Sequence, residues 1–294
     1  MNAARGIAVR LWAALPVWLR ALIVVALVVD VGGLPPDLFL FGNLKFLPAI
    51  PWCLPFTLLW LWGFWLYLSG RGWPKATAEA RRRDLRATRL PGKVWAWALV
   101  AGGLGMLSVV GVSFLTLRLA DLSADAYHLA VDLSAYPAWT VAAGLISISL
   151  VAGVVEEAGY RGYMLSLMER RYGWIVGILF TGLVFFFDHH FSHAYATYAF
   201  LPFFMLVSAL HGLLVYLTRS ILPSMLLHFV ADLTVIPIQY GIVGHVDFTP
   251  VWKTGVDQVF IGMVALVLVS AALAVPAFLR LAAISRGSCG AVTG

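Results

Sequence analysis

Long apolar runs dominate the sequence and are separated by short polar segments. A helix that crosses the hydrocarbon core of a membrane needs about 20 mostly apolar residues. The runs that come close to this length are residues 18–34, 47–69, 94–117, 138–159, 172–189, 196–217, 221–240 and 257–281. They are continuous rather than alternating, which favours helices over the strands of a membrane barrel. The pattern therefore predicts an all-α polytopic membrane protein with about eight transmembrane helices.

Helix breakers and basic residues mark the ends of some runs. Gly32-Gly33-Leu34-Pro35-Pro36 is a breaker cluster, so we expect the first helix to end there. The seventh run begins at Leu222-Pro223 and contains Pro237, which predicts a kinked or incomplete helix. Arginines before the first run resemble the start of a signal peptide. Because no small-residue cleavage site follows them, we expect an uncleaved first span.

The composition agrees with a membrane protein and excludes other classes. Apolar residues make up 62% of the 294 residues, and only 12% carry a formal charge, about half the usual share in soluble domains. The mean hydropathy is +0.91. These values exclude a soluble enzyme, a disordered chain and a nucleic-acid module. The cysteines, Cys53 and Cys289, are too few and too far apart in sequence to indicate a disulfide framework or a zinc ribbon.

The distribution of positive charge predicts the orientation in the membrane. Segment 70–93 is rich in Lys and Arg, and such segments stay in the cytoplasm. If this segment is cytoplasmic, all basic residues except Lys45, Arg118 and Lys253 face the inside, and both termini are cytoplasmic. Basic runs can also bind nucleic acid. A topology signal together with contact to anionic membrane lipids explains segment 70–93 more simply, and we expect no nucleic-acid partner.

The chain shows no internal repeat, and we divide it by its spans. Residues 1–137 form a three-span region that includes the basic segment 70–93, part of which is helix-prone from Ala76 to Arg89. Residues 138–240 carry most of the charged residues that lie inside spans. Residues 241–294 form the last span and a tail.

A first polar cluster lies in the fourth span. An ionisable side chain costs about 2.5–3.5 kcal/mol at the centre of a membrane helix, so it is a candidate for function. Glu157 and Arg161 are four residues apart, in the order that favours an ion pair on a helix. Glu156 is turned about 100° away and is left unpaired. An unpaired carboxylate in a low-dielectric site could act as a general base. Alternatively, both acids mark the end of the span and Arg161 extends to the headgroups.

A second cluster ends the fifth span. Phe185 precedes His189 by four residues, and Phe186 precedes His190 by four, so each pair shares a helix face. His193 completes a group of three histidines, which raises the prospect of a zinc site. For His190 and His193 we favour a polar cap at the membrane surface.

A third cluster lies in the seventh span. His228 and Asp232 share a helix face within an apolar segment, where Asp232 could orient the imidazole. The pair could also merely satisfy its own hydrogen bonds. His211, in the sixth span, has no such companion in the sequence, and we expect a packed histidine bonded across helices.

Glu156 falls near the inner end of its predicted span and His189 near the outer end of the next. The fifth helix must therefore start deeper, or tilt, for the clusters to meet around one cavity.

The three clusters in this order resemble a known family. Glu156-Glu157-x-x-x-Arg161, Phe185-x-x-x-His189 and His228-x-x-x-Asp232 are similar to the motifs of the CAAX-protease and bacteriocin-processing family of intramembrane endopeptidases, which includes the type II CAAX prenyl endopeptidase. The resemblance covers about residues 138–240. The first motif is fairly specific and the second is weak, but the ordered trio is strong.

The resemblance implies a role for each residue. Glu156 would activate a water, and Glu157 with Arg161 would hold the site together. His189 and His228 would position the water or polarise the scissile carbonyl. Asp232 stands where the family has Asn or Asp; because an ionised carboxylate cannot donate a hydrogen bond, orienting His228 is its safer role.

Other interpretations stay open. Glu156, His189 and His228 could bind a divalent zinc ion, but no HExxH motif is present and we favour a site without metal or other cofactor. A non-catalytic bacteriocin-immunity protein of the same fold and a proton-coupled transporter are the alternatives. A transporter would usually show two related halves. The expected partners are a membrane-embedded or lipidated peptide or protein substrate and membrane lipids. The expected location is a bacterial inner membrane.

Overall fold

The protein is a helical bundle, described by a computed structural model for residues 10–122, 132–193, 196–243 and 249–290. Within these residues all regular structure is helical. The longer helices are α2 (Val17–Phe46), α3 (Cys53–Leu68), α4 (Ala78–Leu85), α5 (Gly92–Leu119), α6 (Ala138–Val151), α7 (Leu165–Tyr172), α8 (Trp174–Ser192), α9 (Leu201–Thr218), α10 (Leu222–Gln239) and α12 (Gln258–Gly290). The short α11 (Val251–Thr254) precedes α12.

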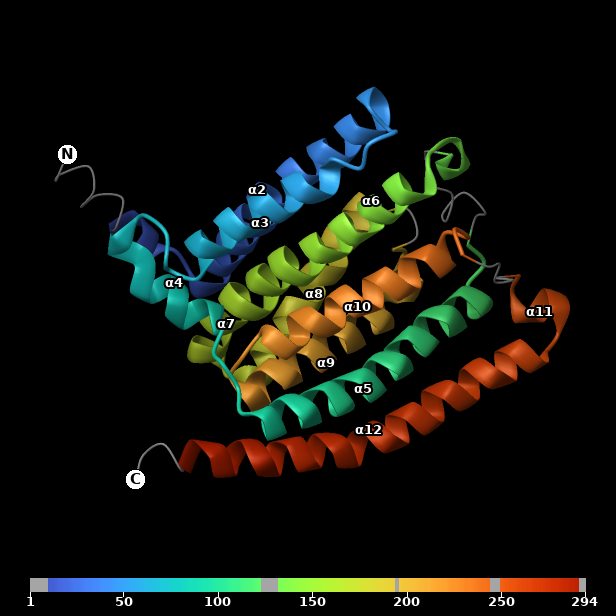
Figure 1. The fold of residues 1–294 in the computed structure, drawn as a ribbon. Coiled ribbons are helices and arrows are strands. Elements are labelled where there is room, and N and C mark those ends of the chain that lie inside the picture. The colour runs from blue at the N-terminus through green and yellow to red at the C-terminus, as the bar shows by residue number, and fades with distance from the viewer. Residues whose placement is uncertain (1–9, 123–131, 194–195, 244–248, 291–294) are drawn as a thin grey trace.

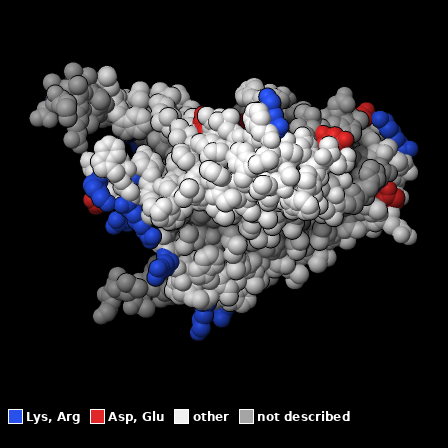
Figure 2. Space-filling view, turned by 45° about the horizontal axis from the view of Figure 1, so that its top comes forward, with Lys and Arg blue, Asp and Glu red and all other residues white. Residues whose placement is uncertain are grey.

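Seven helical segments of the described part are long and apolar enough to cross a membrane. The one predicted run not among these seven, 47–69, corresponds to α3, an apolar helix of 16 residues. Large apolar side chains cover much of the outside, among them Leu59 on α3 and Leu268 on α12, which are 63% and 64% exposed, and Figure 2 shows a surface with few charges along its middle. A water-soluble protein would not expose so much apolar surface. The prediction of an all-α, multi-pass integral membrane protein is confirmed.

The first helix does not end at the breaker cluster, so this prediction was wrong. α2 continues through Pro35 and Pro36 to Phe46. A proline has no N–H, so Pro36 leaves the carbonyl of Gly32 without its helical partner. The indole N–H of Trp60, on α3, donates to that carbonyl at 2.9 Å. A neighbouring helix thus supplies the missing hydrogen bond, which is how membrane helices tolerate proline.

The fourth span is longer than predicted and changes its winding. α6 continues as a π-helix (η4, Ala152–Met164) and then as α7, so one span runs from Ala138 to Tyr172. Glu156 therefore lies near the middle of the span and not at its inner end. The expected mismatch in depth between Glu156 and His189 came from ending this span too early, at residue 159.

The helices pack side by side and form one bundle (Figure 1). α12 lies along α5 at one edge, and α2 and α3 lie together at the opposite edge, with the α6–η4–α7 span, α8, α9 and α10 between them. α4 lies at one end of the bundle, where α2 begins and α12 ends. We call this end the basic end, because it carries the Lys- and Arg-rich segment 70–93.

A glycine allows the central span to approach α10 closely. A Cβ atom at Gly153 would lie 2.9 Å from the carbonyl oxygen of Met225 and 3.1 Å from the Cβ of Phe229, both on α10. Small residues at such crossings let two helix backbones approach. This close approach brings the acidic residues of η4 next to the histidine of α10.

The basic segment 70–93 folds against the bundle. The helix-prone part, predicted over Ala76 to Arg89, forms α4 from Ala78 to Leu85. Arg81 is buried and donates to the carbonyls of Gly72 at 3.2 Å and Pro74 at 2.7 Å. Its guanidinium therefore fixes the loop that precedes α4.

Candidate active site

Glu157 is the centre of a buried polar cluster. Its side chain is fully buried, and so is that of Arg161, one turn later on η4. Arg161 Nη1 lies 3.1 Å from Glu157 Oε1, which is the ion pair that the spacing predicts. The guanidinium also lies over the ring of Phe185, 4.4 Å from its centre. Phe185, a secondary candidate from the sequence, thus covers the arginine through a cation–π contact.

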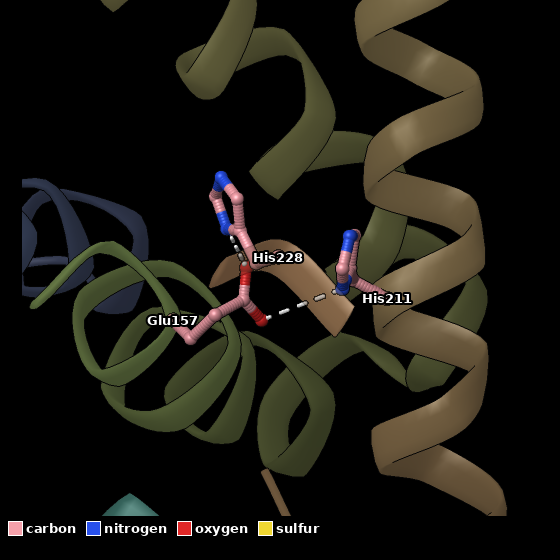
Figure 3. A group of neighbouring side chains, drawn as sticks. All are labelled: Glu157, His211 and His228. Atoms are coloured by element: carbon pink, nitrogen blue, oxygen red, sulfur yellow. Dashed lines mark hydrogen bonds and ion pairs between the residues drawn. The ribbon is translucent and has the colours of Figure 1, made fainter. Parts of the chain in front are cut away.

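Glu157 also holds the histidine of α10. His228 Nδ1 lies 2.8 Å from Glu157 Oε1. Because an ionised carboxylate only accepts hydrogen bonds, Nδ1 carries a proton and donates it to Glu157. Figure 3 shows the second ring nitrogen of His228 directed away from the carboxylate.

His211 and Ser224 belong to the same cluster, which their positions in the sequence do not indicate. Ser224 Oγ donates to Glu157 Oε2, and His211 Nδ1 lies 2.6 Å from Ser224 Oγ. Since the serine proton is used on Glu157, His211 donates to Ser224. His211 is bonded across helices, as expected, but its ring lies 3.8 Å from the Glu157 carboxylate (Figure 3). No spacing rule could reveal this contact, because His211 and Glu157 lie on different helices.

A second set of side chains lines a cavity of about 630 Å³ beside the cluster. Glu156, His189, His211, His228 and Asp232 all contribute to its wall. Glu156 Oε2 lies 3.9 Å from His228 Nε2, and Asp232 Oδ2 lies 3.6 Å from the same nitrogen. Glu156 Oε2 is buried and has no hydrogen-bond partner within the described residues. The two consecutive glutamates thus differ: Glu157 is fully paired behind His228, and Glu156 faces the cavity with an unpaired oxygen.

His189 faces the cavity and His190 does not. His189 Nδ1 lies 2.9 Å from the carbonyl oxygen of Phe185, so Nδ1 carries a proton and donates it to this oxygen. In the neutral ring Nε2 is then unprotonated and can accept a hydrogen bond. The rings of Phe185 and His189 meet edge to face, with their centres 4.4 Å apart. His190 instead donates to the carbonyl of Ala196 at 2.7 Å, outside the wall of this cavity.

Two acidic residues of α2 also line the cavity and were missed. Asp30 and Asp37 lie in the first transmembrane span and contribute to the cavity wall. The rule that charges inside spans are functional candidates could have found Asp30, which falls within run 18–34. Asp37 lay beyond the point where that helix was expected to end.

The residues that could hold a metal ion differ from those expected. The sequence suggests Glu156, His189 and His228 as a ligand set, whereas the close group in the structure is Glu157, His211 and His228, with ligand atoms within 4.8 Å of one another. Both oxygens of this glutamate already accept hydrogen bonds, and Arg161 supplies a positive charge beside it. The donor set is therefore satisfied as a hydrogen-bonded network, and it does not fit a metal ion well.

The fold and the cavity define a polytopic membrane protein with a polar site lined by residues of η4, α8, α9 and α10. Residues 137–234 match the family model for Rce1-like type II CAAX prenyl endopeptidases. This match agrees with the resemblance of the three sequence motifs to the CAAX-protease and bacteriocin-processing family. Neither the curated proteins nor the solved structures contain a match to the chain.

Proposed function

We propose that the protein is an intramembrane endopeptidase that hydrolyses a peptide bond through a water activated by Glu156. One observation carries the proposal: an unpaired carboxylate oxygen of Glu156 faces the cavity beside the Nε2 atom of His228. Such a hydrolysis needs a general base, an imidazole, and space for a water and a peptide. The family match supports a protease of this kind.

In the proposed reaction Glu156 takes a proton from a water as the water oxygen attacks the scissile carbonyl carbon. His189 Nε2 accepts a hydrogen bond from the water and orients it. His228 Nε2, when protonated, donates to the oxygen of the tetrahedral intermediate. Glu156 then returns its proton to the departing amine, and the C–N bond breaks. Asp232, with Oδ2 3.6 Å from His228 Nε2, would supply a negative charge beside the imidazolium.

The supporting residues would act through His228. Glu157 accepts the Nδ1 proton and so directs Nε2 to the cavity. Arg161 balances the charge of Glu157, and Ser224 occupies its other oxygen. No step in this mechanism requires a metal ion.

The proposed substrate is a membrane-associated or lipidated peptide or protein. Apolar side chains of several helices, including Met106, Val110, Phe203 and Val207, complete the cavity wall around the polar groups. A cavity of about 630 Å³ is within the size range that binds small ligands or a short peptide segment. We further propose that the basic end faces the cytoplasm, in a bacterial inner membrane.

The decisive experiment compares membrane peptides in cells that produce the wild-type protein or Glu156→Gln. A substrate should accumulate uncut in Glu156→Gln cells and be cleaved by purified wild-type protein in vesicles. Glu79→Gln, on the exposed face of α4, is the matched control and should behave as wild type. Cleavage retained by Glu156→Gln would exclude Glu156 as the base. If no peptide changes and the variant instead loses proton-driven uptake, the transporter alternative holds.

A further inference from the structure

A second cavity lies at the basic end, where the start of α2, α4 and α7 meet. It has a volume of about 460 Å³ and shares no lining residue with the cavity of Glu156. Arginines from all three helices line it: Arg20, Arg83, Arg170 and Arg171. Figure 2 shows that Lys and Arg gather at this end of the molecule.

The positive charge of this cavity is only partly balanced. Asp84 is its one acidic lining residue among the described residues, so four arginines and one aspartate leave a formal charge of +3. Asp84 Oδ1 pairs with Arg83 Nε and with Arg170 Nη1, each at 2.8 Å. Arg20 and Arg171 have no acidic partner within 4 Å in the described part of the chain. Arg20 Nε is buried and lacks a hydrogen-bond partner there. A buried donor without a partner is costly, so an anion is the expected occupant.

Most of the remaining wall of the cavity is apolar. Val17 and Val24 of α2, Leu167 of α7 and Trp12 line it. Tryptophan is enriched where a membrane protein meets the headgroup layer. Guanidinium groups bind phosphate with two parallel hydrogen bonds. The cavity therefore combines a phosphate-binding part with a surface suited to an acyl chain.

We propose that this cavity binds an anionic membrane phospholipid, with the headgroup phosphate between Arg20 and Arg171 and an acyl chain along Val17, Val24 and Leu167. Basic pockets between membrane helices bind anionic lipid headgroups in this way. The bound lipid would connect the start of α2 with α7, the helix that continues directly from η4. This proposal is independent of whether the protein is a protease.

The test is native mass spectrometry of the purified full-length protein titrated with phosphatidylglycerol. Phosphatidylcholine, which has no net charge, and inorganic phosphate are titrated in parallel. The test variant is Arg20→Gln with Arg171→Gln. The matched control is Arg82→Gln with Arg89→Gln, which removes the same charge from exposed arginines of the basic segment outside the cavity.

We expect wild type to bind phosphatidylglycerol in preference to phosphatidylcholine, and the test variant to bind it about 30-fold more weakly. The control variant should bind nearly as well as wild type. Equal losses in both double variants would overturn the proposal, because diffuse surface charge would then explain binding. Binding of phosphatidylcholine as tight as that of phosphatidylglycerol would also overturn it. Inorganic phosphate that binds as tightly as the lipid would exclude the acyl-chain contact. If the double variant does not fold, Arg171→Gln alone should show a smaller loss in the same assay.

Discussion

Glu157 accepts a hydrogen bond from Nδ1 of His228 at 2.8 Å, and this contact decides which nitrogen of His228 faces the cavity. A glutamine is not equivalent to the carboxylate, because its NH₂ group can donate to Nδ1. The ring would then no longer be fixed in the tautomer that carries its proton on Nδ1. We therefore expect Glu157→Gln to lower kcat by about 10²- to 10⁴-fold with little change in KM. Steady-state kinetics on the identified substrate, with ¹⁵N NMR of the His228 ring, would check this. An unchanged ring tautomer would contradict the assigned role.

Ser224 should support the same carboxylate from its other side. Ser224→Ala removes a hydrogen bond to a buried charged group, so we expect about a 10- to 100-fold loss of kcat. Ser208→Ala is the control, because Ser208 is equally buried and its hydroxyl has no partner in the described residues. Ser224→Thr, which keeps the hydroxyl, should recover part of the activity. Equal effects of the two alanine variants would contradict a specific role for Ser224.

His189 and His190 should differ sharply in their effect on cleavage. His189 lines the cavity, and His190 is bonded to the carbonyl of Ala196. We expect His189→Ala to reduce kcat by about 10²- to 10⁴-fold, the usual contribution of a group that acts on proton transfer. His190→Ala should keep most of the activity. The reverse result in a cleavage assay would assign the second motif to Phe186 and His190.

The close approach of η4 and α10 should be sensitive to a single methyl group. At Gly153 a Cβ would meet backbone atoms of α10, which cannot move alone, so Gly153→Ala should destabilise the protein by about 1–3 kcal/mol and reduce cleavage. Gly103, on α5, has no contact within 4 Å of its Cβ position from other parts of the described chain, so Gly103→Ala should be neutral or slightly stabilising. Thermal unfolding in detergent compares the two variants. A neutral Gly153→Ala would show that this crossing is loose.

An ion pair at the end opposite α4 should make stability depend on pH. Asp257 precedes α12, and hydrogen bonds from the Phe260 N–H and from Arg118 hold the pKa of its carboxyl below the ordinary value. A lowered pKa means that Asp257 stabilises the fold above its ordinary pKa, and that this contribution is lost as the pH falls through the lowered value. Asp257→Asn should therefore unfold at a lower temperature than wild type at pH 7. The difference should disappear in strong acid, and a difference that persists there would contradict this origin.

Much of this arrangement could be predicted from sequence, because hydropathy and helical spacing are local properties. Run length identified the helices, and the i,i+4 rule identified the Glu157–Arg161 pair. The predictions that failed depended on more than local pattern: Trp60 of α3 lets α2 continue through its prolines, and the continuous span formed by α6, η4 and α7 places Glu156 near the middle of that span. Ser224 and His211 join the site through contacts with each other and with Glu157, which no pattern within a single helix could indicate.

The π-helical winding of η4 has a consequence for how the chain tolerates length changes. A π-helix forms i→i+5 hydrogen bonds and so holds more residues per turn than the α-helices on either side. Deleting one residue from Ala152–Met164 could relax the segment toward α-helical winding without losing any apolar surface. It would nevertheless rotate α6 and α7 relative to each other, and Glu156 would no longer face His228. In this segment the number of residues sets the direction of the side chains, and deletions should be less tolerated than conservative substitutions.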